Sequence, residues 1–225
     1  MPNFNIVKKN EVEDTFRVQK IKADFDIKAE HSNENFVGNI ELPKEWNIGL
    51  IVGASGTGKT TIAKELFSDI LITDFEYKAT SVIDDMPKNV SVDDITKTFY
   101  AVGFGSVPCW LKPYRVLSNG EKMRVDLARS ILEYDQFAFD EFTSVVDRNV
   151  AKTCCLAINK AIRKNNKKFI AISCHYDIIN DLQPDWIFDT NEMKMVFMMA
   201  HEQQENSLSE NVGETNGKSL GDIII

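Results

Sequence analysis

The fold of this 225-residue chain is decided by one stretch, Gly53-Ala54-Ser55-Gly56-Thr57-Gly58-Lys59-Thr60. The stretch matches the pattern G-x-x-x-x-G-K-[ST] in full and follows the apolar run 48–52, which has the composition of a buried strand. Residues 60–67 continue as an amphipathic helix. A chance glycine-rich turn is the alternative, but it would not explain the flanking strand and helix. The order strand, glycine loop, helix therefore predicts a phosphate-binding loop in an α/β domain.

Each part of this loop has a predicted chemical role. Glycines let the backbone curl so that successive N–H groups point at a phosphate, and the following helix adds partial positive charge there. Lys59 is expected to reach the β- and γ-phosphate oxygens, and the Thr60 hydroxyl to bind Mg²⁺. We therefore expect bound Mg-ATP. The other predicted nucleotide contacts are Gly53, Ser55, Gly56, Gly58 and Thr61.

A second apolar segment, residues 137–139, ends in the acids Asp140 and Glu141. Acids at the carboxyl end of a strand lie at the ligand edge of a parallel sheet. Asp140 is expected to hold Mg²⁺, usually through water, and Glu141 to orient or deprotonate an attacking water. Taken alone, the pair could equally be solvated acids at a strand end.

A capped helix is predicted over residues 119–133, because Ser118 suits an N-cap and Glu121 stands three positions later. The same segment, Leu117-Ser118-Asn119-Gly120-Glu121-Lys122, resembles the ABC ATPase signature LSGGQ. Ser144-Val145-Val146-Asp147 resembles the D-loop of that family, and His175 after the predicted strand 168–173 matches its switch histidine. Together with the glycine loop and the acids at 140–141, these segments make five motifs in family order, and they carry this resemblance.

The resemblance to ABC ATPases implies a composite site. Members of the family form head-to-tail dimers around two ATP molecules, each contacting the glycine loop of one subunit and the signature of the other. A signature serine at a helix N-terminus suits an anion, because hydroxyl, backbone N–H and helix dipole all favour it. A two-fold arrangement would complete two sites at once. The residues implied are Ser118, Gly120 and Asp147 as nucleotide contacts and Lys59, Glu141 and His175 as catalytic residues.

The chain departs from transporter cassettes between Lys59 and Ser118. Only 59 positions separate them and no glutamine lies between, so we expect a shortened helical subdomain and a replaced Q-loop glutamine. Asp84, or alternatively Asp85, is the predicted replacement and metal ligand. The shortening argues against transport, and no long heptad insertion like those of Rad50-like and SMC-like proteins is present. Over roughly residues 48–190 the pattern is closer to small bacterial and phage ABC ATPases associated with a predicted GNAT-type acetyltransferase.

The remaining elements complete a P-loop NTPase unit with a parallel central sheet. Segments 15–27, with a bulge, and 36–42 are expected to pair as an N-terminal antiparallel hairpin after a loose leader at 1–14. Phe16, Phe25 and Phe36 are each candidates for stacking on adenine or for core packing. Further strands are predicted at 71–72, 80–83 and 168–173, a terminal hairpin at 186–188 and 193–198, helices at 93–102 and 150–164, a loop at 108–113, and domain limits at 15–200.

Composition limits the cellular setting. The chain has no apolar stretch of membrane-spanning length, no secretion signal and no metal spacing among its four cysteines, so we expect a cytoplasmic protein with reduced thiols. The net charge of −8 does not support nucleic-acid binding, although a local basic groove for DNA is not excluded. Residues 201–225 carry five acids and one lysine and are predicted to be disordered; Ile223-Ile224-Ile225 could be a docking peptide or a frayed end.

Together these features predict a soluble ABC-type ATPase that dimerises on ATP and hydrolyses it to drive or gate a partner. That partner could be an acetyltransferase-like protein, a nuclease or DNA. Two alternatives stay open: an ATP-dependent switch with little turnover, and a P-loop phosphotransferase acting on a small molecule. Glu141 and His175 argue against the switch, and the phosphotransferase leaves residues 117–122 unexplained.

Overall fold

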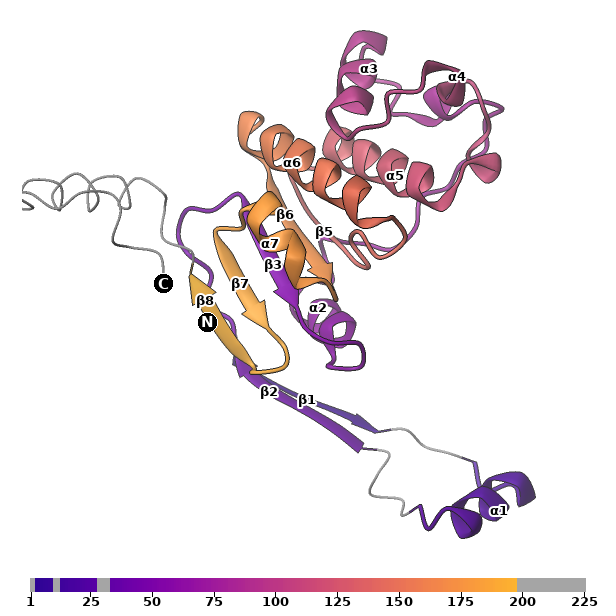
Figure 1. Ribbon diagram of the computed structural model, residues 1–225, viewed down its shortest axis with the longest axis vertical. Coiled ribbons are helices and arrows are strands. Elements are labelled where there is room, and N and C mark those ends of the chain that lie inside the picture. The colour runs from indigo at the N-terminus through magenta and orange to yellow at the C-terminus, as the bar shows by residue number, and fades with distance from the viewer. Residues whose placement is uncertain (1–2, 10–12, 28–32, 198–225) are drawn as a thin grey trace, which may run out of the picture.

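A computed structural model of the chain describes residues 3–9, 13–27 and 33–197 (Figure 1). Its centre is a six-stranded sheet in the order β4-β5-β6-β3-β7-β8, in which β8 alone runs antiparallel to its neighbour. The expected α/β fold is thus confirmed. The strands are β3 (Ile48–Val52), β4 (Leu71–Ile72), β5 (Gln136–Phe139), β6 (Lys168–Ser173), β7 (Trp186–Asp189) and β8 (Lys194–Phe197).

The two faces of the sheet carry different cores. All five residues of β3 are buried. Ile48, Leu50 and Val52 face the core built by α5 (Asn119–Glu133), α6 (Arg148–Lys164) and α7 (Ile179–Leu182). Ile51 faces the opposite core with α2 (Lys59–Phe67). This alternation is the period of two of a strand covered on both faces, and it explains why β3 reads as a continuous apolar run.

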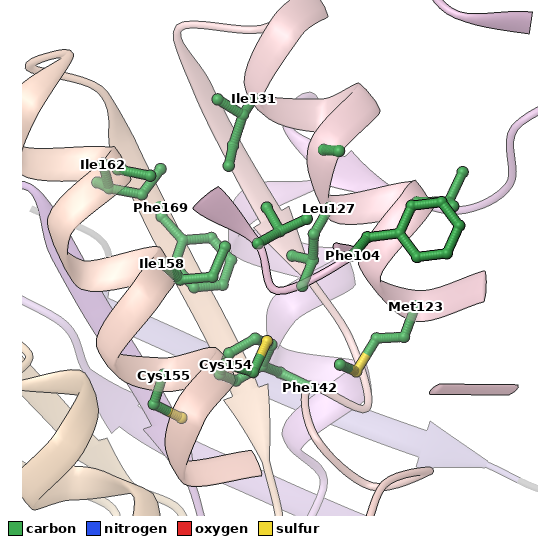
Figure 2. Close-up of a cluster of buried hydrophobic side chains, with 14 of the residues drawn as sticks. Phe104, Met123, Leu127, Ile131, Phe142, Cys154, Cys155, Ile158, Ile162 and Phe169 are labelled. Carbon is green, nitrogen blue, oxygen red and sulfur yellow. The ribbon is translucent and has the colours of Figure 1, made fainter. Parts of the chain in front are cut away.

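Helices α5 and α6 pack on each other and on β6 through apolar side chains (Figure 2). Leu127 and Ile131 of α5 lie beside Ile158 and Ile162 of α6, with Phe169 of β6 beneath them. Cys154 and Cys155 belong to the same core, and burial raises the pKa of the Cys154 thiol to about 12. All four cysteines are unbridged. The two helices that follow the signature and D-loop segments are thereby fixed on the sheet.

A small helical lobe covers α5 at one end of the molecule (Figure 1). Ser91 caps its longest helix by accepting a hydrogen bond from Asp94 N. The strand expected at 80–83 is wrong, because Val82–Asp85 form a 3-10 helix that tucks Val82 into the core. The loop expected at 108–113 is wrong for residues 108–110, which belong to α4 (Val107–Trp110). The elements of the lobe are η2 (Val82–Asp85), α3 (Val92–Ala101), α4 (Val107–Trp110) and η3 (Tyr114–Val116), and η4 (Tyr176–Ile178) follows β6 elsewhere.

The N-terminal hairpin exists, but from other residues than expected. β1 (Asn3–Lys9) pairs with β2 (Asn33–Asn39), so a strand occupies half of the predicted leader. The predicted strand at 15–27 is wrong, because α1 (Phe16–Asp24) is a helix that begins at the N-cap Thr15. Its Gln, Lys and Ala residues favour a helix. No residue of α1 is buried, so the alternating apolar side chains do not pack on a core as they would in a strand.

The hairpin forms an arm with α1 near its far end (Figure 1). Its base is anchored by aromatic packing: Phe4 meets Phe188 of β7 edge to face, at 5.9 Å between ring centroids. Gly38 leaves room for this ring, because a Cβ there would lie 2.6 Å from Phe4. Phe36 and Ile40 are buried in the same core as α2. The arm is therefore tied to the sheet beside the glycine loop.

The other expected elements are confirmed, with ends shifted by a few residues: the helices at 60–67, 93–102, 119–133 and 150–164, the strands at 71–72, 137–139 and 168–173, and the terminal hairpin. The acidic segment 201–225 lies outside the described residues. Among the helices that the structure describes, none is long and apolar enough to cross a membrane.

Gly49→Ala should destabilise the fold by about 1–3 kcal/mol, lowering Tm by about 3–10 °C. A Cβ at Gly49 would lie 2.1 Å from the indole of the fully buried Trp186, so the ring or the strand must shift. Thermal unfolding followed by circular dichroism measures the effect. The matched control is Gly105→Ala, whose Cβ would meet Tyr100 at an ordinary 3.5 Å. Equal shifts in both variants would contradict the packing argument.

Candidate phosphate-binding site

The glycine loop joins β3 to α2 at the carboxyl edge of the sheet. Gly56 and Gly58 have φ of 84° and 85°, a left-handed conformation that glycine adopts without strain. Gly58 is also the N-cap residue of α2, and its carbonyl accepts from Ile62 N at 2.8 Å. The loop thus curls at the amino end of a helix, where N–H groups and helix dipole favour an anion.

Lys59 lies almost wholly buried, with 9% of its surface exposed. Its Nζ donates to the carbonyls of Gly53 at 2.9 Å and Ala54 at 2.8 Å. These two bonds hold the ammonium against the first residues of the loop. A buried cation at this point provides a fixed positive charge for a phosphate.

The loop borders a pocket of about 250 Å³. Seven of its eight lining residues are predicted site residues, six from the loop and the start of α2 and the seventh Glu141. Lys8 of β1, which the sequence pattern did not single out, is the eighth. No motif marks Lys8, because only the pairing of β1 with β2 brings it to this place. The lining consists of Lys8, Ser55, Gly56, Gly58, Lys59, Thr60, Thr61 and Glu141.

The two predicted magnesium-binding residues contact each other. Thr60 Oγ1, at the start of α2, donates to Asp140 Oδ2 at 2.8 Å, although 80 residues separate them. Asp140 Oδ1 accepts from Glu141 N at 2.9 Å, which fixes the carboxylate from both oxygens. A hydroxyl and a carboxylate beside a phosphate loop are the donors that Mg²⁺ prefers. The residues present therefore fit Mg-ATP.

Glu141 occupies a strained position at the end of β5. Its φ of 53° is left-handed, and so is that of Thr143, at 66°. Phe142 between them is fully buried and donates its N–H to Ile172 O at 2.9 Å. Non-glycine residues in this conformation are sparse and occur preferentially at functional sites. The anchored Phe142 leaves the Glu141 side chain exposed toward the pocket.

A second layer of residues supports the loop and was missed by sequence reasoning. Thr190 lies so close that a Cβ on Gly53 would come within 2.1 Å of its hydroxyl, which explains glycine at position 53. Thr57 Oγ1 hydrogen-bonds to Thr190 Oγ1 at 2.5 Å, and Ala54 N donates to Asn191 Oδ1 at 3.2 Å. Both supporting residues come from the β7–β8 turn, far away in sequence.

The signature segment begins α5 with the predicted capping box. Ser118 Oγ and Ser118 N each lie 2.8 Å from Glu121 Oε2, and Glu121 N donates back to Ser118 Oγ at 3.4 Å. The hydrogen bond from the Ser118 backbone lowers the pKa of Glu121. Gly120 abuts Val146, since a Cβ on it would lie 2.9 Å from Val146 Cγ1. Signature and D-loop segments are thus neighbours within one chain.

The D-loop and switch segments are joined by ion pairing. Asp147 caps α6 by accepting from Asn149 N and Val150 N. Arg148 contacts Asp177 through two hydrogen bonds, of 2.8 and 2.6 Å, which lower the pKa of Asp177. His175 precedes Asp177, and its N–H donates to Ser173 Oγ at 3.2 Å.

The switch segment is also linked to the glycine loop. Tyr176 donates its hydroxyl to Asp189 at 2.9 Å and accepts from Asn191 at 2.7 Å. Burial and the bond to Asp189 raise the pKa of Tyr176 to about 12. Because Asn191 also accepts from Ala54, hydrogen bonds connect the residue after His175 to the loop.

The structure does not bring all predicted site residues together. Ser118, Gly120, Asp147 and His175 do not line the pocket of the glycine loop in the described part of the chain. Asp84 lies in η2, where it accepts from Ser81 Oγ at 2.5 Å, and Asp85 accepts from the N–H groups of Lys78 and Ala79.

The three aromatic candidates for adenine separate clearly. Phe16 begins α1 and Phe25 follows its last residue; they are 80% and 71% exposed, and Figure 1 shows α1 away from the sheet. Phe36 is buried, and its ring covers Gly58, where a Cβ would come within 2.4 Å of it. Phe36 therefore packs against the glycine loop at Gly58.

Comparison with known proteins supports the fold. No family model matches the chain, and no curated protein does. Many solved structures are similar, and three of them illustrate the match. The dimeric bacterial ABC transporter cassette MJ0796 is 14% identical, covering 69% of this chain and 87% of the other, with a TM-score of 0.54. Its dimeric post-hydrolysis state with ADP and Pi is 11% identical over 74% and 93%, with a TM-score of 0.57.

The third structure is an inward-facing ABC transporter of metal-chelate type, 14% identical over 75% of this chain and 78% of that chain, with a TM-score of 0.57. At such identities the similarity concerns the fold alone. The chain therefore has the α/β fold of ABC ATP-binding cassettes, with the N-terminal antiparallel hairpin as a separate small sheet.

Proposed function

We propose that this chain is a cytoplasmic ABC-type ATPase that binds Mg-ATP, dimerises head-to-tail around two ATP molecules and hydrolyses ATP to drive or gate a partner. One observation carries the proposal: the hydrogen bond between Thr60 and Asp140 at a pocket that also holds Lys59 and Glu141. The residues proposed to bind phosphate, to bind Mg²⁺ and to act as the carboxylate base thus lie together at one edge of the sheet. The family resemblance of the five motifs supports the same conclusion.

Binding follows from the loop geometry. The N–H groups of the loop and of the first turn of α2 would bind the phosphates, and Lys59 would contact the β- and γ-phosphate oxygens. Thr60 and Asp140 would hold Mg²⁺, which neutralises charge on the phosphate oxygens when bound. Gly53, Ser55 and Thr61 are further proposed nucleotide contacts, and Ser55 and Thr61 line the pocket. Asp84 is the proposed replacement for the Q-loop glutamine.

Hydrolysis follows from the position of Glu141. Its carboxylate would accept a proton from a water whose oxygen attacks the γ-phosphorus, while the bond from that phosphorus to the bridging oxygen of ADP breaks. Asp140 orients Glu141 through its backbone N–H. His175, which follows β6, is also a proposed catalytic residue. Hydrogen bonds from Ala54 to Asn191 and from Asn191 to Tyr176 position the segment that carries His175 relative to the loop.

The composition of the pocket supports the proposed dimerisation. Ser118, an exposed donor at the amino end of α5, does not line it, although its hydroxyl, N–H and helix dipole suit a phosphate. A second chain facing head-to-tail would bring Ser118, Gly120 and Asp147 to each nucleotide. The two cassette structures compared above are dimeric by their descriptions.

The partner is the open part of the proposal. An acetyltransferase-like protein of the GNAT type is the expected partner from the subgroup resemblance, and DNA is a weaker candidate for a chain of net charge −8. Co-purification from the native host followed by mass spectrometry identifies it. The ATPase unit is proposed to run to about residue 200 and to include β1, with 201–225 as an acidic tail.

Lys59→Ala should raise the Kd for Mg-ATP at least about tenfold, because it removes a charge-assisted contact to the phosphates. Isothermal titration of the full chain measures this effect. The matched control is Lys64→Ala, an exposed lysine on the same helix, which should leave the Kd unchanged. A wild-type chain that binds no ATP would overturn the proposal.

A further inference from the structure

Lys8 of β1 lines the pocket of the glycine loop, and its role there rests on the proposed function. We propose that Lys8, from the N-terminal arm, is a second cationic contact for the phosphates of bound ATP, opposite the loop that carries Lys59. The arm would thus belong to the nucleotide site. Nothing in the motif pattern of the loop assigns this role.

The position of Lys8 follows from strand geometry. Successive side chains of a strand point to opposite faces, so Phe4, Ile6 and Lys8 share one face of β1. Phe4 and Ile6 on that face pack in the core with α2 and the sheet. Val7 on the other face is 52% exposed. Lys8 therefore continues the face of the arm that is turned toward the body of the protein.

The register of the hairpin brings this face to the glycine loop. Ile6 stands opposite Phe36, and Phe36 packs on Gly58. Lys8 lies two residues farther along β1, roughly 7 Å from Ile6. Figure 1 shows that the arm leaves the sheet at the edge where β3 and β7 end. Lys8 thereby reaches the pocket that Ser55, Gly56, Lys59 and Glu141 line.

The chemistry of the pocket favours an anion between the two lysines. Lys59 is held under the loop by two carbonyls, whereas Lys8 comes from the arm. The Lys8 ammonium has three N–H donors, which can contact any of several phosphate oxygens. Its attraction adds to that of the loop N–H groups and the helix dipole. A triphosphate bound at the loop would have positive charge on both sides.

The test compares full-length variants by isothermal titration with Mg-ATP. Lys8→Gln should raise the Kd about three- to tenfold, and Lys8→Arg should restore it to near the wild-type value. The Kd of Lys8→Gln should also depend less steeply on salt concentration, because one screened charge contact is lost. A merely structural role of Lys8 would not change that slope.

Lys64→Gln is the control for net charge, and Tm values check folding. Because Lys8 is exposed, its replacement should change Tm only slightly. The inference is overturned if Lys8→Gln binds like the wild type, if Lys8→Arg is as weak as Lys8→Gln, or if Lys64→Gln is equally weak. If Lys59→Ala weakens ATP binding while Lys8→Gln does not, the role of Lys8 is excluded and the proposed function still holds. A wild-type chain without ATP binding would overturn both.

Discussion

Glu141→Gln should lower the steady-state rate of ATP hydrolysis about 10²–10⁴-fold and leave ATP binding intact. The amide keeps the size and shape of the carboxylate but cannot accept the proton of the attacking water. The substitution does not disturb the local backbone, because the left-handed φ of 53° is set by the buried Phe142 and by the hydrogen bond from Glu141 N to Asp140. Loss of turnover with retained binding is the result that only a catalytic carboxylate predicts.

Phosphate release from Mg-ATP measures this effect, and titration with Mg-ATP measures binding. Glu192→Gln is the matched control, because it removes an equal charge at an exposed position in the β7–β8 turn. Undiminished turnover in Glu141→Gln would exclude Glu141 as the base. A wild-type protein without turnover, alone or with its partner, would contradict the ATPase proposal and favour the ATP-dependent switch.

Ser118→Arg should weaken the ATP-induced dimer about tenfold to a hundredfold and reduce turnover with it. In the proposed dimer, the Ser118 hydroxyl and the N–H groups of α5 lie against the γ-phosphate of the other chain. Arginine removes that hydroxyl, and its long side chain obstructs the approach of the helix end to the phosphate. Size-exclusion chromatography with light scattering, with and without ATP, measures the dimer.

The substitution also removes a helix cap, which costs about 1 kcal/mol by itself. Ser91→Arg is therefore the matched control. Ser91 caps α3 in the same way, accepting from Asp94 N at 3.1 Å and donating to Asp94 Oδ2 at 2.7 Å. Both variants should lose similar stability, and only Ser118→Arg should lose the dimer. A monomer whose activity is unaffected by Ser118→Arg would favour the small-molecule phosphotransferase.

Local patterns predicted the elements on which the site is built. The glycine loop has its strand and helix where expected, since glycine at positions 56 and 58 permits a backbone that other residues resist. The capping box at Ser118 and Glu121 was readable because its hydrogen bonds span only three residues. Such features depend on neighbours in the chain.

In the N-terminal arm, local patterns predicted the wrong elements. Alternating apolar residues at 15–27 indicated a strand, but α1 buries none of them. A period-two pattern predicts a strand only where a sheet face is present to cover it. The polar segment 3–9 forms the strand instead, because pairing with β2 supplies its hydrogen bonds and Phe4 anchors it on Phe188.

The sequence by itself determined the phosphate loop, the capped signature helix and the α/β class, because short-range chemistry specifies each of them. Only the tertiary structure decided that Thr60 meets Asp140, that Thr190 and Asn191 support the loop, and that Lys8 lies at its pocket. These contacts join segments about 50 to 140 residues apart. The order of parallel strands and the packing of the arm create them, and neither is written in any local pattern.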